Sequence, residues 1–186
     1  ELTAAHPFHD FDNHAFAGLA VRELVRRDRT KLALLSPPLA LTYHHHTANG
    51  FAEALTESGA TGVPFNAVNI DSSMDQIRRC TAELMRRKNR PDGIISSAAA
   101  ATLAVVAGIE DAGMTVGREV DVVSKQSTPL LHLFRPAILV VNEDFRLAGR
   151  ELARSVLGWI DGRDPGTLSS LSVPDTVESY PAAARP

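Results

Sequence analysis

Apolar side chains recur at helical spacing in some segments and form short continuous runs in others, and the two patterns alternate along the chain. Residues 13–27 place Phe16, Leu19 and Leu24 on one face of an amphipathic helix. Residues 31–36 form an apolar run that two prolines end, which is typical of a buried strand. Helices are expected over 13–27, 46–58, 74–88, 98–112 and 143–160, and strands or extended segments over 31–36, 64–69, 93–97, 120–124, 137–141 and 168–174.

Several helix ends carry residues that bind free backbone N–H groups. Asp12 or Asn13 is expected to cap the first helix. Ser73 and Gln76 have the spacing of a capping box. For the last helix Asn142 is the expected cap, and the two acidic residues after it favour the positive end of the helix dipole.

Strands that alternate with helices predict parallel strand–helix–strand units. The fold class is therefore α/β, with an open parallel sheet flanked by helices. Ligands of such sheets bind outside the carboxyl ends of the strands. The loops that follow the expected strands, at 37–45, 70–73, 97–99 and 124–128, are the places to look for a binding site.

The amino-acid composition and net charge limit the classes of function that this chain can have. A chain of 186 residues with 44% hydrophobic and 22% charged residues is typical of one globular unit. A net charge of −3 argues against a DNA-gripping surface in this segment, because such surfaces are basic. The single cysteine, the lack of a membrane-length apolar run and the lack of a signal-peptide pattern lead us to expect a cytoplasmic protein with no membrane contact.

Catalytic and metal-binding patterns are weak. The sequence contains no G-x-S-x-G, Walker or G-x-G-x-x-G motif, so we expect no enzyme and no cofactor. Residues 44–46 read His-His-His, which invites a metal interpretation. Adjacent side chains do not share a face of a helix or strand, so a solvated loop or a pH-sensitive rim is the favoured alternative.

The order of several short motifs resembles the effector-binding domains of lac-repressor-type (LacI family) transcription regulators. Residues 12–13 and 24–35 resemble the first core helix and strand of that family. Residues 50–55 read G-F-A-E-A-L, where the family has G-F-x-x-A-L. Residues 91–95, 112–120, 135–136 and 143–149 resemble four further family segments, and the likeness covers about 160 residues.

The resemblance implies a periplasmic-binding-protein-like type I fold, in which two lobes enclose a small ligand. By that mapping, residues 1–11 are a remnant of the amino-side lobe or its crossover, and residues 12–135 form the carboxyl-side lobe. Residues 136–166 return as strand and helix to the amino-side lobe. Residues 167–186 cross back and end in a tail. The rest of the amino-side lobe and a DNA-binding headpiece would lie outside this sequence.

The resemblance also marks ligand-facing positions, at which this chain departs from the family pattern. Thr47 stands where an arginine is usual, and Ala99 and Gln126 stand where aspartates are usual. These departures remove the carboxylates of a standard monosaccharide site but keep some hydrogen-bonding capacity.

Other candidate ligand contacts come from residue chemistry. Tyr43 offers a ring face and a hydroxyl, although it could equally pack the loop over the sheet. Lys125 favours an acidic ligand such as a sugar acid, unless it is a solvated loop lysine. Asn69 ends an expected strand and could reach the cleft, whereas Asp71 is better explained as a turn residue.

The resemblance therefore implies the sensor of a DNA-binding transcription regulator, and two alternatives remain. As a regulator it would bind a sugar, polyol or sugar acid between its lobes, form a homodimer, and contact DNA only through the absent headpiece. The first alternative is a periplasmic sugar-binding protein of a transporter, which shares the two-lobed fold. The second is a single-domain flavodoxin-like enzyme or response module.

Overall fold

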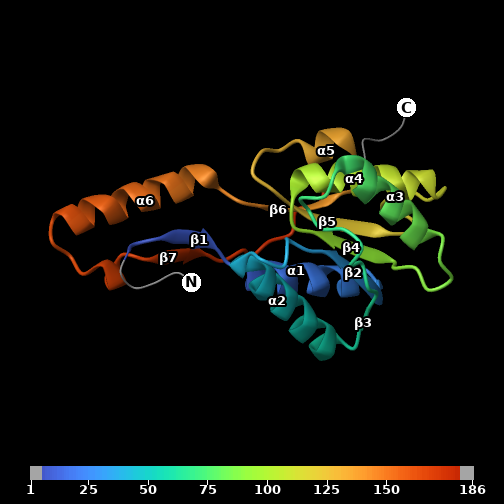
Figure 1. Cartoon of the computed structure of the whole chain (residues 1–186), viewed down its shortest axis with the longest axis horizontal. Helices are drawn as coiled ribbons and strands as arrows, with labels where there is room; N and C mark the ends of the chain where they lie inside the picture. The colour runs from blue at the N-terminus through green and yellow to red at the C-terminus, as the bar shows by residue number, and fades with distance from the viewer. Residues whose placement is uncertain (1–5, 181–186) are drawn as a thin grey trace.

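A five-stranded parallel sheet forms the centre of the computed structural model, which describes residues 6–180. The strand order is β3-β2-β4-β5-β6, and helices cover both faces of the sheet (Figure 1). The strands are β2 (Lys31–Leu35), β3 (Thr61–Gly62), β4 (Gly93–Ser96), β5 (Asp121–Gln126) and β6 (Leu139–Asn142). The predicted α/β fold class is confirmed.

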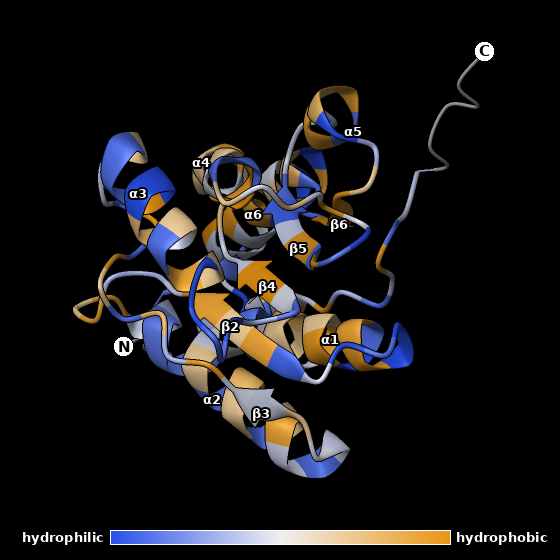
Figure 2. Ribbon diagram, turned by 90° about the vertical axis from the view of Figure 1, so that its right-hand side faces the viewer, coloured by the Kyte–Doolittle hydropathy of each residue, from blue (hydrophilic) through white to orange (hydrophobic). Residues whose placement is uncertain are grey.

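Two pairs of helices bury the two faces of this sheet. Helices α1 (Asn13–Arg26) and α2 (Thr42–Ser58) lie on one face, and α3 (Met74–Met85) and α4 (Ala99–Asp111) on the other (Figure 1). The short helix α5 (Leu131–Phe134) follows β5. Figure 2 shows the hydrophobic residues of β2 and β4 between these layers, as expected for strands buried on both faces. We call the sheet with these five helices the main body.

Glycine permits the close approach of each helix pair. A Cβ added to Gly50 on α2 would lie 2.2 Å from the carbonyl oxygen of His14 on α1. A Cβ added to Gly108 on α4 would lie 2.4 Å from the carbonyl oxygen of Arg78 on α3. Any side chain at either position would push the helices apart, so the interhelical distance depends on these two residues.

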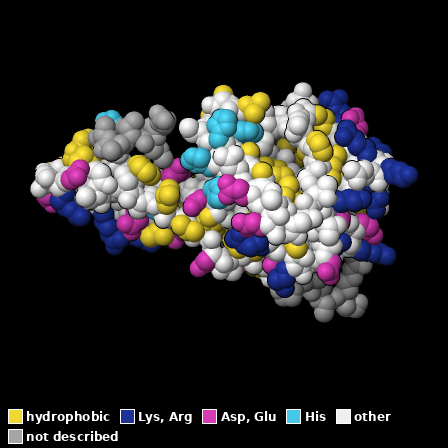
Figure 3. Space-filling model, turned by 90° about the horizontal axis from the view of Figure 1, so that it is seen from below, with side chains coloured by type: hydrophobic (Ala, Val, Ile, Leu, Met, Phe, Trp, Pro, Cys, Tyr) yellow, Lys and Arg dark blue, Asp and Glu magenta, His cyan; other side chains and the backbone are white. Residues whose placement is uncertain are grey.

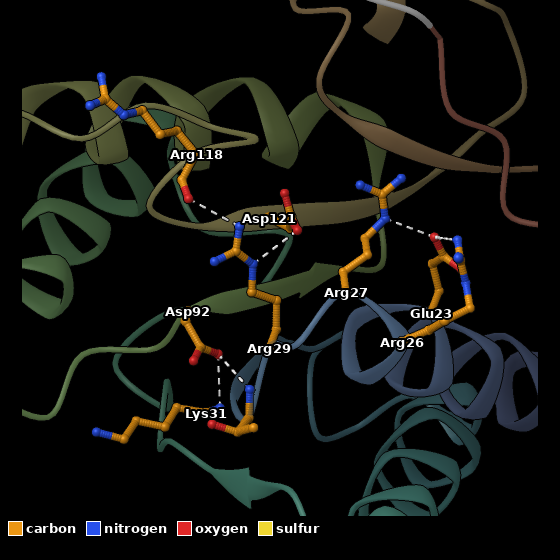
Figure 4. Close-up of polar contacts among 9 residues, drawn as sticks. Glu23, Arg26, Arg27, Arg29, Lys31, Asp92, Arg118 and Asp121 are labelled. Carbon is orange, nitrogen blue, oxygen red and sulfur yellow. Dashed lines mark hydrogen bonds and ion pairs between the residues drawn. The ribbon is translucent and has the colours of Figure 1, made fainter.

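Charged side chains tie the strands together at the amino edge of the sheet (Figure 4). The Arg29 Nε lies 3.0 Å from a carboxylate oxygen of Asp121, whose side chain is only 4% exposed. The Asp92 carboxylate accepts hydrogen bonds from the backbone N–H groups of Thr30 and Lys31. These contacts join the starts of β2, β4 and β5 at the edge opposite to the expected binding site.

A smaller part of the chain extends away from the main body (Figure 1). It consists of the parallel pair β1 (His9–Phe11) and β7 (Ser170–Ser172), helix α6 (Phe145–Ile160) and a 3-10 turn over Pro165–Thr167. The rings of Phe11 and Phe145 meet edge to face at 5.4 Å, and the Ser155 hydroxyl donates to the carbonyl of Leu168. We call this part the extension.

The predicted placement of residues 136–166 in the amino-side lobe needs a correction. Their strand and helix were predicted to lie together in the amino-side lobe. The strand β6 instead pairs with β5 as the edge of the main sheet, with Gln126 opposite Asn142. Of these residues, α6 and the start of the 3-10 turn belong to the extension. Residues 1–5 and 181–186, at the ends of the first and last predicted segments, lie outside the described residues.

The expected strand over 64–69 is wrong. The ladder to β2 contains only Thr61 and Gly62, and the Val63 N–H makes one further bond to the Leu32 carbonyl. Pro64 has no N–H to continue the ladder. Val63, Phe65 and Val68 are nevertheless buried, so their apolar pattern reflects packing of a loop rather than of a strand.

Several element ends also differ from the sequence-based expectation. Helix α2 begins at Thr42 instead of residue 46, so the His44–His46 run lies on a helix. Strand β5 continues to Gln126, because β6 pairs with it along its last residues. Asp144 caps α6 instead of Asn142, by accepting from the N–H groups of Arg146 and Leu147. Asp12, one of the two residues expected to cap α1, is its cap, and the Ser73–Gln76 capping box is confirmed.

Candidate functional site

The carboxyl ends of β2, β4, β5 and β6 lie at one edge of the sheet, because the strands are parallel. Three chain segments pass between the main body and the extension at this edge: residues 12–13 at the junction of β1 and α1, residues 143–144 between β6 and α6, and residues 173–178 after β7. We call them the three connections. The candidate site is therefore framed by loops of the main body and by these connections.

Lys125 lies inside the protein and not in a solvated loop. It is 6% exposed, and its ammonium donates to the Asn13 side-chain oxygen and, at 2.7 Å, to a carboxylate oxygen of Glu143. The ammonium also lies 4.8 Å from the centre of the Phe16 ring. Its positive charge is thus neutralised within the chain, which weakens the expectation of an acidic ligand.

Gln126 is also engaged in contacts within the chain. Its amide nitrogen donates to the Asn142 side-chain oxygen at 2.9 Å, and its oxygen accepts from the N–H of Leu131. Asn142 in turn donates to a carboxylate oxygen of Glu178 at 2.6 Å. Because successive side chains of a strand point to opposite faces, Lys125 and Gln126 reach different neighbours from the same strand end.

Tyr43 and Thr47 occupy the first turns of α2. Thr47 is completely buried, and its hydroxyl donates to the Tyr43 carbonyl at 2.7 Å. Tyr43 is half-buried. Burial raises the pKa of its hydroxyl, and the negative charges of Asp71 and Glu143 raise that pKa further. The charges of Asp71 and Glu143 thus act on the Tyr43 hydroxyl at this edge.

The remaining two candidates contribute little polar chemistry. Ala99 is the first residue of α4 and carries only a methyl group. The Asn69 side-chain oxygen accepts from the N–H of Asp71, and the Asn69 N–H donates to the Ser72 hydroxyl. Asn69 thus shapes the turn that presents Asp71 near Tyr43.

Two hollows open beside these residues. One of about 390 Å³ lies where the three connections meet, and a larger groove of about 890 Å³ lies between the start of α2 and the loop over 62–69. Both volumes fall in the range usual for small-molecule sites. Lys125, Glu143 and Asp12 line the first hollow, and His44, Asn69 and apolar side chains such as Phe51 line the second.

From the sequence alone, Glu143 was expected only to interact favourably with the dipole of the last helix. Its carboxylate is 18% exposed, lines the smaller hollow and is held by Lys125. One sequence feature could have identified it as a site residue: it directly follows a strand, at the edge where ligands of parallel sheets bind. It supplies a carboxylate at this edge, whereas Ala99 and Gln126 do not.

The histidine run lies on the surface near these hollows. Figure 3 shows histidine side chains gathered beside the indentation between the two parts of the molecule. His44 Nδ1 lies 2.7 Å from the Pro37 carbonyl oxygen, and its ring meets that of His45 edge to face. Within residues 6–180, no group of three or more His, Cys, Asp or Glu side chains is arranged to hold a metal ion.

Comparison with known proteins shows which family this chain belongs to. Residues 21–178 match the periplasmic binding protein-like domain. The chain belongs to this family. The HTH-type transcriptional regulator AglR of Rhizobium meliloti (strain 1021) is 24% identical to it over 166 residues, which cover 83% of this chain and 44% of that protein. The resemblance noted in the sequence is therefore confirmed.

Solved structures show the same fold for this domain. A regulatory protein of the LacI family from Chloroflexus aggregans has a TM-score of 0.84 at 19% identity, over 94% of this chain and 63% of that one. A LacI family transcriptional regulator from Arthrobacter sp. FB24, in complex with lactose, has a TM-score of 0.78 at 21% identity, over 95% of this chain and 67% of that one. The domain spans less than half the length of AglR. No helix among the described residues is long and apolar enough to cross a membrane.

Proposed function

We propose that this domain is the effector-binding part of a LacI-type transcription regulator and takes an uncharged sugar or polyol at the carboxyl edge of its sheet. The observation that carries the proposal is the Glu143 carboxylate, which lines the smaller hollow at this edge and whose charge also acts on the Tyr43 hydroxyl. Carboxylates accept hydrogen bonds from ligand hydroxyls, and a tyrosine ring offers an apolar face to a sugar ring. The lactose complex of the Arthrobacter relative supports a sugar as the ligand class.

The charges of the smaller hollow favour an uncharged ligand over a sugar acid. Lys125 is the one cationic side chain among its described lining residues, and Glu143 already pairs with it. Asp12, Asp144 and Asp175 add negative charge to the lining. An anionic ligand would have to displace Glu143 from Lys125 and enter beside further carboxylates, which is electrostatically unfavourable.

The ligand would be enclosed by a second lobe of which the extension is one part. Apolar side chains of α6 remain uncovered: Ile160 is 76% exposed, Leu157 62% and Phe145 58%. Surfaces of this kind mark contact with another part of a protein. In the proposal, a further segment packs on α6 and beside the β1–β7 pair, and the ligand binds in the cleft between the lobes.

Homodimer formation is part of the same proposal. Leu130 is 61% exposed and Leu133 75% exposed, and both lie at α5 with the partly exposed Phe134. We expect this apolar surface to contact a second copy of the chain, since two-fold symmetry suits palindromic operators. Sedimentation should show a dimer for the native protein and a monomer for Leu133→Asp. A dimer that persists in the variant would contradict this surface.

The regulator proposal is tested on the native gene product. We expect its amino-terminal sequence to contain a helix-turn-helix and its affinity for DNA from upstream of its own gene to change when lactose or another uncharged sugar is added. Fluorescence anisotropy measures that affinity. A native protein without DNA affinity would contradict the proposal and favour the transporter alternative, which the relatives named as transcriptional regulators do not support.

A further inference from the structure

The three connections between the main body and the extension all converge on two consecutive residues. Lys125 and Gln126 are the last residues of β5, the strand next to the edge strand β6. Both are buried, at 6% and 2% exposure, although both are polar. Buried polar side chains are retained where they make specific hydrogen bonds, so their partners indicate their role.

Lys125 joins the first connection to the second. Asn13 is the first residue of α1, two residues after the end of β1; its side-chain nitrogen donates to the Phe11 carbonyl while its oxygen accepts from the Lys125 ammonium. Glu143 begins the second connection, and its carboxylate accepts from the same ammonium at 2.7 Å. One buried charge thus holds the ends of two segments that lie far apart in the sequence.

Gln126 secures the third connection from the opposite side of the strand. It binds Asn142, which binds the carboxylate of Glu178. The backbone of Glu178 also exchanges two hydrogen bonds with Val140 on β6, at 2.8 and 3.0 Å. The third connection is therefore also held by backbone hydrogen bonds to β6, whereas the first two connections share the Lys125 ammonium.

We propose that Lys125 is a positioning residue that fixes the extension relative to the main body by binding both of the first two connections. Movement of the extension must lengthen the bond from Asn13 to Phe11 or displace Asn13 or Glu143 from Lys125. A buried ammonium that loses its partners is strongly disfavoured, so Lys125 favours one relative position of the two parts. The inference adds a hinge-setting residue to the proposed function and does not itself require a ligand.

Hydrogen exchange of the native, ligand-free protein tests this role. In Lys125→Met we expect amides over 9–15 and over 143–148 to exchange at least about tenfold faster, because both segments lose a charge-assisted hydrogen bond. Amides of β2 and β4 should be unchanged. Lys31→Met is the matched control, because Lys31 is exposed and lies at the amino edge of the sheet. Unchanged exchange in both segments would overturn the proposal.

A double variant separates positioning from stability. Lys125→Met leaves the Glu143 carboxylate unpaired and lowers Tm, whereas Lys125→Met/Glu143→Gln removes both charges and should recover most of that Tm. We expect fast exchange over 9–15 to persist in the double variant, because the link to Asn13 is still absent. Recovery of both Tm and slow exchange would show a merely structural ion pair and contradict the proposal.

Asn13→Ala provides an independent measurement should Lys125→Met fail to fold. It removes the first link and leaves the Lys125–Glu143 pair in place. We expect faster exchange over 9–15 and unchanged exchange over 143–148. Equally faster exchange of amides throughout the sheet would indicate global destabilisation and overturn the assignment of Lys125 as a positioning residue.

Discussion

Lys125 and Glu143 are 18 residues apart in the sequence, and their charged groups are 2.7 Å apart at the carboxyl edge of the sheet. This pair places a carboxylate at the edge where parallel sheets bind ligands. It also neutralises the lysine that the sequence indicated as a contact for an acidic ligand. An effector at this edge therefore meets a carboxylate whose charge is balanced by Lys125, and it does not meet a free ammonium group.

The Arg29–Asp121 pair at the opposite edge should contribute to stability. Asp121→Asn leaves Arg29 without a buried charged partner, and we expect the free energy of unfolding to fall by about 2–3 kcal/mol. Urea unfolding measures the change. Arg118→Gln is the control, because the Arg118 side chain is 81% exposed and should contribute less than about 0.5 kcal/mol. Equal effects of the two substitutions would contradict the prediction.

Gly50 and Gly149 form a matched pair of helical glycines. Gly50→Ala places a Cβ against the His14 carbonyl and should cost about 1–3 kcal/mol of stability, because α1 and α2 must separate. A Cβ at Gly149 meets nothing within 4 Å, so Gly149→Ala should stabilise α6 by up to about 1 kcal/mol. Thermal unfolding of both variants checks the opposite signs, and the same sign for both would be inconsistent with this packing.

Tyr43 should ionise only at high pH. Its pKa is raised by burial and by the charges of Asp71 and Glu143, so the folded protein holds this proton more tightly than the unfolded chain does. The resulting stability is present below the ordinary tyrosine pKa of 10.0 and is lost as the pH rises through the higher folded value.

Ultraviolet titration measures the tyrosine prediction. The chain has two tyrosines, and the pKa of Tyr180 is also raised, mainly by its hydrogen bond to Glu178. Tyr180→Phe therefore isolates the Tyr43 signal. In that background Glu143→Gln should move the Tyr43 pKa downward, because one negative charge is removed. An unchanged titration curve would place Glu143 too far from Tyr43 to act with it.

Local patterns predicted most of the fold. The helical spacing of Phe16 and Leu24 and the Ser73–Gln76 capping box located α1 and the start of α3 within a residue, because their causes lie within one turn of the helix. The expected strand over 64–69 failed because burial alone does not distinguish a strand from a packed loop, and Pro64 interrupts the ladder.

The site was less predictable, because its contacts are not local. Asn13 lies 112 residues from Lys125 in the sequence, so no local pattern shows that this lysine is buried and paired. Glu143 has the residue type expected at a helix start, which concealed its place in the site. Tyr43 keeps its predicted place near the carboxyl edge, and its role as a ligand contact remains a proposal.

Calorimetric titration of the native protein with uncharged sugars and their acids tests the central proposal most directly. The panel is lactose, cellobiose, maltose and xylitol, with lactobionate and galacturonate as the anionic members. We expect saturable binding of at least one uncharged member and none of the anionic ones. Glu143→Gln should weaken that binding about 10- to 100-fold, because a hydrogen bond to a charged acceptor is lost. Glu53→Gln, an exposed carboxylate on α2, should leave it unchanged. Binding of an acid but of no uncharged sugar, or affinity unaffected by Glu143→Gln, would contradict the account.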